Sequence, residues 1–485
     1  MKCRRPLFLF RMLIALGVIA ALPSCVKDRT KAPDNSGYPD NVAAIIVTKC
    51  ATAGCHNTTS KDGAAGLDMS TWENLMKGGK AGAAVIAYYH AQSTVFLFTN
   101  TDTLLGGVVH PTMPYNGTPL SREEVITLRD WIDAGAPDKN GFVKFSDNPQ
   151  RHKIYVTNQG CDLVAVFDAE SKLIMRYIPV GGDIGPETPH MVRVSDDGSF
   201  WCTSFITGAY LQKFSTVDDH LLGQVDITTG SWNTFALTHD GTKAFAIDFN
   251  GRLRCVDLTN FTVLGGEDDL QSPHGSALSA DEKYLYVTGQ LGNFIYKINV
   301  QDPSAPDPNQ ISLNGNPVTT SHVLDVHDII FSPDKSKYFL SCQYSNEVRV
   351  MNAANDSLLA VIPVGVFPQE FAISTTHPYL FVTCTEDIST FSPNRGSVYV
   401  IDYNTLSVVK SVNTGWQPHG VAVDEGNGLV YVANRNATTG GPAPHHTSQC
   451  AGRNGYLTLI DLNTLELGPG FKTELSVDPY SAAYR

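Results

Sequence analysis

Two cysteines and a histidine stand close together near the start of the chain, in the run CATAGCH at residues 50–56. A cysteine, a short spacer and a Cys-His pair form the attachment motif of haem c, in which two thiols bond the porphyrin vinyl groups and the histidine ligates the iron. The spacer has four residues instead of the usual two, so the chain must bulge, and Gly54 permits a bulge. We therefore predict one haem c on Cys50 and Cys55, with His56 as an axial iron ligand.

Two structural alternatives compete with haem at this motif. A disulfide between Cys50 and Cys55 would leave His56 without a role. A zinc site would need a second pair of ligands, which the neighbouring sequence does not offer.

The surrounding residues resemble the small cytochrome c domains of bacterial lipoproteins, over residues 38–141. The resemblance rests on the CATAGCH box, on GLDMS at residues 66–70 and on WIDAGAP at residues 131–137. It implies a small all-α cytochrome c domain, which we place at residues 38–145. It also implies a second axial ligand in the loop before the last helix, where Met113 lies between two prolines. His110 and His90 are the alternatives to Met113.

Two helices are expected to position this site. Val42, Ile45 and Ile46 share one face of a helix that runs into the motif. Ser121 and Glu124 form a capping box, and the helix after it carries an apolar face. A methionine sulfur as second ligand raises the iron potential relative to a second imidazole, which suits an electron carrier.

The first residues predict export. Four basic residues precede an apolar run at residues 12–22, which ends in Leu-Pro-Ser-Cys25. This is typical of a signal peptide, assigned to residues 1–24, and its ending resembles a lipobox in which Cys25 is acylated. The alternative is a plain signal peptide with an incidental cysteine. A polar tether follows at residues 25–37. We expect an exported protein, anchored by lipid to a bacterial membrane, in the periplasm or on the cell surface.

Residues 152–485 repeat one strand pattern at intervals of about forty residues. The seven copies are IYVTN at 154–158, FWCTS at 200–204, AFAID at 244–248, LYVTG at 285–289, YFLSC at 338–342, LFVTC at 380–384 and VYVAN at 430–434. Strands that alternate in polarity, with Gly, Asn and Asp turns, predict a β-propeller. The copies resemble the YVTN family of seven-bladed propellers. The domain begins on a second strand and ends on a first strand, so we expect both ends to close one blade.

The first strand of each blade opens at one mouth of the central channel. Aligning the copies places seven residues there: His190, Asn233, His274, His327, Gln369, His419 and Tyr480. The four neutral imidazoles could hold copper, another transition metal or a second cofactor. The alternative is that each histidine only bonds a neighbouring blade.

Cysteine use completes the residue-level predictions. Cys161 and Cys450 lie in equivalent loops of neighbouring blades, and an oxidising compartment favours a disulfide between them. The alternative is that the loop carrying Cys450 is too mobile to reach Cys161. The remaining propeller cysteines lie in strands, where they pack as small apolar residues: Cys202, Cys255, Cys342 and Cys384.

Charge and motif content narrow the function. The net charge of −13 gives no electrostatic basis for nucleic-acid binding. Our leading hypothesis is a multidomain electron-transfer lipoprotein, in which the haem domain precedes an all-β propeller that docks a redox partner protein or hosts a redox site. One alternative is an oxidoreductase with a metal or second cofactor at the histidine-lined mouth. Another is a propeller binding module with an accessory haem.

Overall fold

The computed structural model describes residues 35–182, 185–388, 395–444 and 450–485. The predicted signal peptide, the acylation site at Cys25 and most of the tether lie outside the described residues. Within the described part of the chain, no helix has both the length and the apolar content needed to cross a bilayer.

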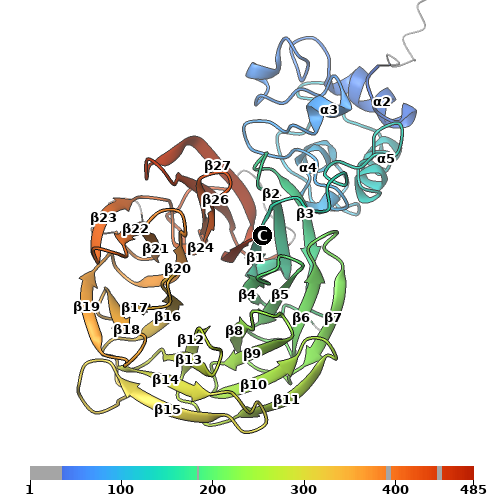
Figure 1. Ribbon diagram of the computed structural model, residues 1–485. Coiled ribbons are helices and arrows are strands. Elements are labelled where there is room, and N and C mark those ends of the chain that lie inside the picture. Colours follow the sequence, from blue (N-terminus) through green and yellow to red (C-terminus); the bar gives the residue numbers. More distant parts are fainter. Residues whose placement is uncertain (1–34, 183–184, 389–394, 445–449) are drawn as a thin grey trace, which may run out of the picture.

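Residues 35–150, here called the N-terminal segment, contain short helices joined by turns and loops (Figure 1). The α-helices of this segment are α2 (Asp40–Ile45), α3 (Trp72–Leu75), α4 (Thr94–Thr99) and α5 (Arg122–Asp133). A π-helical turn, Ile46–Cys50, continues α2, and single 3₁₀ turns lie at Lys61–Gly63 and His90–Gln92.

The predicted all-α cytochrome c domain is therefore wrong as a fold class. The longest of these helices, α5, has 12 residues, and α2 has six. The apolar pattern that starts at Val42 ends after two turns, because the chain beyond it is rich in Gly, Thr, Ser and Asn, which favour turns over helix. The described chain is instead almost entirely β structure, with a few short helices before it.

The segment nevertheless has a hydrophobic core of its own. The capping box predicted for α5 is present, since the Ser121 hydroxyl accepts from the Glu124 N–H and the Glu124 carboxylate accepts from the Ser121 N–H. The helix buries its apolar face, and Trp131 meets Tyr38 edge to face at 6.2 Å. The Trp72 indole N–H donates to the Ala136 carbonyl at 2.9 Å. These contacts join α3, α5 and the loops beside them.

The rest of the chain forms seven four-stranded antiparallel sheets arranged in a ring, which is a seven-bladed β-propeller (Figure 1). Blade 1 consists of β4 (Pro189–Val194), β5 (Phe200–Phe205), β6 (Tyr210–Ser215) and β7 (Leu221–Asp226). Blade 2 consists of β8 (Trp232–Leu237), β9 (Lys243–Asp248), β10 (Arg252–Asp257) and β11 (Thr262–Glu267). Blade 3 consists of β12 (Pro273–Leu278), β13 (Tyr284–Gly289), β14 (Phe294–Asn299) and β15 (Asp307–Ser312). Blade 4 consists of β16 (Val326–Phe331), β17 (Lys337–Cys342), β18 (Glu347–Asn352) and β19 (Leu358–Pro363). Blade 5 consists of β20 (Pro368–Ile373), β21 (Tyr379–Cys384), β22 (Ser397–Asp402) and β23 (Ser407–Val412). Blade 6 consists of β24 (Pro418–Asp424), β25 (Leu429–Asn434), β26 (Asn454–Asp461) and β27 (Leu467–Val477).

Blade 7 is built from both ends of the propeller sequence, as predicted. Its strands are β28 (Pro479–Tyr484), β1 (Lys153–Asn158), β2 (Leu163–Asp168) and β3 (Ile174–Pro179). β28 pairs antiparallel with β1, and the Ser481 N–H donates to the Thr157 hydroxyl at 2.9 Å. The inner strands β28, β4, β8, β12, β16, β20 and β24 contact one another in this order and surround the channel. Gly420 lets β24 approach β28, because a Cβ there would lie 2.4 Å from the Tyr480 carbonyl oxygen.

The N-terminal segment packs beside blade 7 and the outer strand of blade 6 (Figure 1). Ile86 is 3% exposed and belongs to the same apolar cluster as Leu475 of β27. Tyr89 lies 5.6 Å from Tyr177 of β3, and the Gln92 amide donates to the Ser476 hydroxyl at 3.3 Å. The CATAGCH motif is thus carried by a segment fixed to the propeller rim.

Candidate functional sites

The CATAGCH motif forms a compact turn at the end of the π-helical turn. The Cys55 N–H donates to the Thr52 carbonyl at 3.0 Å, and the His56 N–H donates to the Cys50 carbonyl at 3.1 Å. Gly54 has a φ of +84°, and no atom lies within 4 Å of a Cβ built there. A left-handed glycine therefore absorbs the longer spacer, as the sequence predicted.

Both thiols of the motif are free. Cys50 is buried in the segment core and Cys55 is exposed, so the alternative of a disulfide between them is not what the structure shows. Burial, with a further contribution from Cys55, raises the pKa of the Cys50 thiol to about 12. The Cys50 thiol is thus protonated at neutral pH and is not poised as a thiolate nucleophile.

The orientation of His56 suits iron ligation. Its Nδ1 lies 3.3 Å from the Leu67 carbonyl oxygen, so Nδ1 carries the proton in the neutral ring and donates to that oxygen. Nε2 is then left with its lone pair, which is the arrangement that metal-bound histidines adopt. Leu67 belongs to the GLDMS run noted in the sequence, so that run supplies the carbonyl that orients the ring.

Met113 lies in an irregular loop that exposes apolar surface. Its N–H donates to the Phe98 carbonyl at 2.7 Å, and its side chain is partly buried. Leu104 and Tyr115 of the same loop are 86% and 66% exposed. The two free thiols and the oriented His56 are the groups that covalent attachment of a haem c requires.

His90 and His110, the alternatives to Met113 as second axial ligand, each contact another side chain. His90 Nδ1 lies 2.8 Å from both carboxylate oxygens of Asp133, and its ring meets Phe96 edge to face. His110 is exposed and lies 3.3 Å from the Thr112 hydroxyl.

At the propeller channel, the seven aligned residues all occupy the second position of an inner strand. Each is less than a tenth exposed. The five rings among them form a closed series of contacts, with centroid separations of 6.0 Å for His190–His274, 4.0 Å for His274–His327, 5.5 Å for His327–His419, 3.6 Å for His419–Tyr480 and 4.1 Å for Tyr480–His190. We call this set the aromatic ring of the channel. The alignment of the repeats therefore identified residues whose rings contact one another in the folded protein.

The YVTN-like strands position this ring through their hydroxyl residue. The fifth residue of the second strand of one blade donates to the carbonyl of the ring residue in the next blade: Thr157 to His190 at 3.1 Å, Thr288 to His327 at 3.1 Å, Ser341 to Gln369 at 2.6 Å and Thr383 to His419 at 2.8 Å. The repeated Thr or Ser thus has a definite task. It fixes the backbone of the neighbouring inner strand.

The imidazoles have few hydrogen-bond partners. Nδ1 of His274 meets the His327 carbonyl at 3.0 Å, and Nδ1 of His327 lies 3.0 Å from the Gln343 amide. Nε2 of His190, Nε2 of His327 and both ring nitrogens of His419 are buried without a partner. Burial lowers the pKa of His274 to about 3, and it lowers the pKa of the other three histidines strongly as well, so these rings are neutral.

The four histidines do not form a preformed metal site. Among the residues that the structure describes, no group of three or more His, Cys, Asp and Glu side chains is arranged to hold one metal ion. The His274 and His327 rings are tilted by 32° relative to each other, and His274 Nδ1 contacts the His327 carbonyl. The suggestion of copper or another metal here stays a sequence prediction.

Sequence reasoning missed the charged groups beside the ring. Asp328 and Glu370 follow ring residues directly in β16 and β20, and both are buried. Burial raises the pKa of Asp328 to about 7, with repulsion from Glu370 adding to it, and burial raises the pKa of Glu370 to about 8. Glu370 Oε1 lies 3.5 Å from His419 Nδ1, and because both groups favour their neutral forms, this contact is not an ion pair near neutral pH. Reading the position after each aligned ring residue would have found both acids.

A cavity of about 300 Å³ lies in the channel beside these carboxyls. Arg193, Asp328 and Glu370 line it, together with apolar residues and the far ends of the inner strands at Val194 and Tyr484. This cavity therefore lies inside the channel, beyond the ring residues.

The structure joins Cys161 and Cys450 in the disulfide that the sequence proposed, with Cα atoms 5.3 Å apart. Cys161 Sγ also accepts from the Ser476 hydroxyl at 2.9 Å. The bridge thus links blade 7 to the long loop of blade 6, close to the place where Gln92 of the N-terminal segment contacts Ser476. The other four propeller cysteines are free and buried, in agreement with their predicted packing role.

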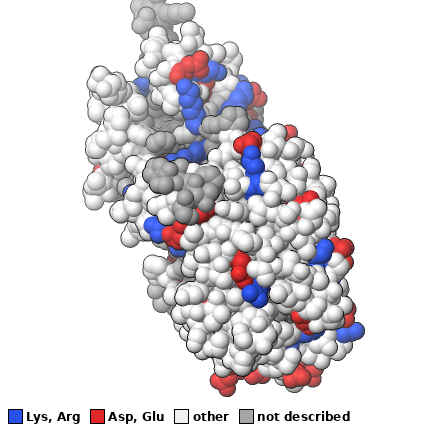
Figure 2. Space-filling view, turned by 90° about the vertical axis from the view of Figure 1, so that its left-hand side faces the viewer, with Lys and Arg blue, Asp and Glu red and all other residues white. Residues whose placement is uncertain are grey.

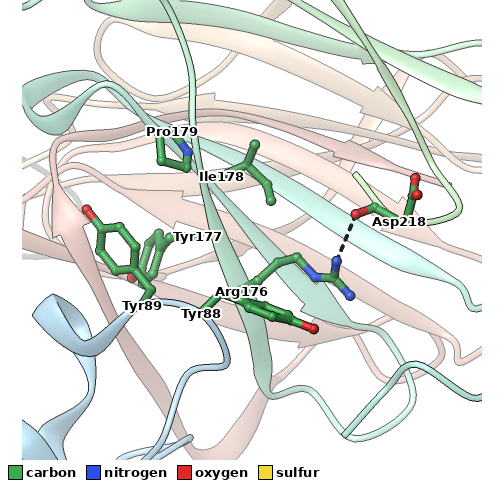
Figure 3. Close-up of a pocket in the computed structure, with 7 residues that line it drawn as sticks. All are labelled: Tyr88, Tyr89, Arg176, Tyr177, Ile178, Pro179 and Asp218. Carbon is green, nitrogen blue, oxygen red and sulfur yellow. Dashed lines mark hydrogen bonds between the residues drawn. The ribbon is translucent and has the colours of Figure 1, made fainter. Parts of the chain in front are cut away.

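A second cavity, of about 410 Å³, lies where the N-terminal segment meets blade 7 (Figure 3). Tyr88 and Tyr89 approach from the segment, and Arg176 and Tyr177 approach from β3. Arg176 Nη1 donates to the Asp218 carbonyl at 2.8 Å, which is drawn as the dashed line in Figure 3. This cavity is a gap in the seam between two packed units.

Comparisons with known proteins agree with the propeller. No protein-family model matches the chain. Antigen Lp49 of Leptospira interrogans serogroup Icterohaemorrhagiae serovar copenhageni (strain Fiocruz L1-130) is 23% identical over 327 residues, which cover 61% of this chain and 66% of that protein. The match thus spans slightly less than two thirds of that relative's length.

Two solved structures share the fold at low identity. A functionally unknown protein from Desulfotomaculum acetoxidans DSM 771 superposes with a TM-score of 0.52 at 12% identity, covering 68% of this chain and 98% of its own. A candidate 6-phosphogluconolactonase from Bacteroides uniformis ATCC 8492 gives a TM-score of 0.52 at 13% identity, covering 69% of this chain and 100% of its own. At these identities the likeness concerns the propeller fold alone.

Proposed function

We propose that the chain is an exported electron-transfer protein that carries one haem c on its N-terminal segment. Cys50 and Cys55 would hold the porphyrin, His56 would be one axial ligand, and Met113 would be the other. The observation that carries the proposal is the CATAGCH turn, with both thiols free and with His56 Nδ1 held by the Leu67 carbonyl.

Cys50 and Cys55 would each hold the porphyrin through a thioether. Each thioether would form by addition of the thiol S–H across one vinyl double bond, with sulfur on one vinyl carbon and hydrogen on the other, so that no oxidant or reductant is consumed. The bound iron would supply one-electron redox chemistry. The protein's own residues hold the group: the Leu67 carbonyl orients His56, and the Phe98 carbonyl anchors the backbone of Met113.

The propeller would act as the docking scaffold for a redox partner protein. Its repeats resemble those of the YVTN family, and its rim is fixed to the haem-bearing segment by Ile86, Tyr89 and Gln92. Acylation at Cys25 would hold the protein at a bacterial membrane, facing the periplasm or the cell surface. A Cys25→Ser variant should then move from the membrane fraction to the soluble fraction, while a variant at Cys202 should not.

The direct test is covalent haem content. The full chain, produced in a host with a haem c maturation system, should show one haem per chain by denaturing mass spectrometry and a pyridine haemochrome spectrum. The double variant Cys50→Ser/Cys55→Ser should lose covalent haem, and the control Cys202→Ala should keep it. Wild-type protein without covalent haem would refute the proposal.

A further inference from the structure

A basic side chain and two carboxyl groups face each other across the propeller channel. Arg193 is the fifth residue of β4 in blade 1, and Asp328 and Glu370 are the third residues of β16 and β20 in blades 4 and 5. In a ring of seven blades, blades 4 and 5 lie opposite blade 1. A guanidinium therefore extends from one wall of the channel and two carboxyls from the other, and all three line the same cavity.

These groups do not satisfy one another. In the part of the chain that the structure describes, Arg193 forms no ion pair with either carboxyl. Its Nη2 reaches only the Ser276 carbonyl at 3.5 Å, while its buried Nε has no partner. Glu370 Oε1 is likewise buried without a hydrogen bond. Buried polar atoms in folded proteins are nearly always paired, because an unpaired one has lost its hydrogen bonds to water without replacement. We therefore expect a polar group to occupy the space between Arg193 and the two carboxyls.

The rest of the cavity lining is mixed, and the cavity has a volume of about 300 Å³. Leu237, Phe371 and Val421 contribute apolar surface, whereas Asp196, Ser481 and Tyr484 contribute polar groups. The fifth position of an inner strand, which is arginine in β4, is alanine in the neighbouring β28, and this Ala483 also lines the cavity. Its small side chain leaves room beside the guanidinium for a ligand carboxylate.

We propose that the channel binds a small α-amino acid as its zwitterion. The carboxylate would pair with Arg193 in the bidentate manner that guanidinium favours. The ammonium would donate to Glu370 and Asp328, because its positive charge favours their ionised forms, and the side chain would lie against Leu237, Phe371 and Val421. Asp328 Oδ2 already accepts from the Phe371 N–H. A simple carboxylate would leave Glu370 Oε1 without a partner, and a simple amine would leave Arg193 Nε without one. This proposal concerns the propeller and does not depend on the haem.

The test compares a whole ligand with its two halves. Isothermal titration of the full-length protein with L-leucine should show saturable binding. Isoamylamine, which lacks the carboxylate, and 4-methylpentanoate, which lacks the ammonium, should each bind at least about tenfold more weakly, because each loses one charge-assisted contact. L-alanine should bind more weakly than L-leucine, since it buries less apolar surface.

Variants locate the site. Arg193→Gln and Glu370→Gln should each weaken L-leucine binding at least about tenfold. Arg254→Gln, on β10, should leave binding unchanged, because Arg254 pairs with Asp268 away from the channel. If a channel variant fails to fold, the comparison of L-leucine with isoamylamine and 4-methylpentanoate on the wild-type protein still tests the proposal. The absence of heat with L-leucine and with L-alanine, equal binding of all three leucine-type compounds, or full binding by Arg193→Gln would each overturn the proposal. Haem content, measured separately on the same preparations, keeps this outcome distinct from that of the haem proposal.

Discussion

The hydroxyl of Thr383 shows how a single repeated residue builds the channel site. It donates to the His419 carbonyl at 2.8 Å, and equivalent hydroxyls in three other blades do the same for their neighbours. The backbone of the ring residue is thereby fixed, and its side chain is free for other contacts. The Thr or Ser of each YVTN-like copy, a residue type common in β-strands, therefore fixes the position of a ring residue.

At the motif, Met113 is the residue whose role is most open to direct measurement. If its sulfur ligates the iron, Met113→His should lower the midpoint potential and remove any sulfur-to-iron absorption band of the oxidised protein, because imidazole is the stronger donor. Met76→Leu, which replaces a buried methionine of the segment core, should change neither. A Met113→His spectrum identical to that of the wild type would show that Met113 is not a ligand.

Glu370 should make stability depend on pH in an unusual direction. Its folded-state pKa is raised to about 8 and that of Asp328 to about 7, mainly by burial, whereas unfolded carboxyls titrate near pH 4. The folded protein therefore binds more protons between these values, so the free energy of unfolding falls as pH rises through this window.

The matching variant is Glu370→Gln, which removes the charge and keeps the shape. At pH 9 it should be more stable than the wild type by on the order of 2 kcal/mol, and at pH 4 the two should be nearly equal. Thermal unfolding at both pH values measures this difference. Glu282→Gln, in the turn between β12 and β13, is the control and should not alter the pH profile; an equally steep loss of stability in Glu370→Gln would show that the effect arises elsewhere.

At the scale of elements, the sequence predicted the strands much better than the helices. Period-two alternation in IYVTN and its copies is repeated seven times, so each weak signal is supported by the others, and the closure by β28 follows from the order of strands. The helical segment has no such repetition. Its α5 was predictable from the Ser121–Glu124 capping box, but the loops between its helices are held by contacts such as the one from the Trp72 indole to Ala136, which local sequence does not reveal.

The same difference of scale explains the site predictions. Alignment of the repeats found the aromatic ring because its members share one position in every blade. It could not show that the ring is buried, or that Arg193 lies opposite Asp328 and Glu370, because those facts depend on how seven blades close into a circle. The Cys161–Cys450 disulfide could be predicted from the sequence, because equivalent loops of adjacent blades lie near each other in any propeller.

The disulfide is the element-scale feature with the clearest expected effect. Cys161→Ser/Cys450→Ser should lower stability by about 2–4 kcal/mol, because the bridge restrains a long span of the unfolded chain. Thermal unfolding with and without a reducing agent measures this: the wild type should lose stability on reduction and the variant should not. A variant as stable as the oxidised wild type would show that the loop of blade 6 is held without the bridge.

At the scale of the whole molecule, the segment and the propeller share one seam. On the face drawn in Figure 2, charged side chains are sparse, and acidic and basic ones lie close to each other. The seam is instead held by apolar and aromatic contacts, with Ile86 inserted into the cluster of blades 6 and 7. The position of the haem motif relative to the propeller therefore depends on a small number of side chains.

Replacing Ile86 should loosen this seam. Ile86→Ala should cost about 2–4 kcal/mol locally and should make the link at residues 138–152 more sensitive to limited proteolysis, because the segment would leave the rim more often. Ile45→Ala, within the segment's own core, should destabilise the segment without the same increase in cleavage of the link. Unchanged cleavage in Ile86→Ala would mean that Tyr89 and Gln92 suffice to hold the two units together.

The closure of blade 7 also has a consequence for how the protein is made. Thr157 and Ser481, which bond each other where β1 meets β28, are 324 residues apart in the chain. Until β28 has folded against it, β1 has no inner partner, and its backbone donors and acceptors face solvent as an open sheet edge. Such edges attract strands from other chains. Folding of this protein should therefore depend on chaperones that shield this edge until β28 pairs with β1, and a shortage of them should appear as aggregation of newly made protein rather than as instability of the finished ring.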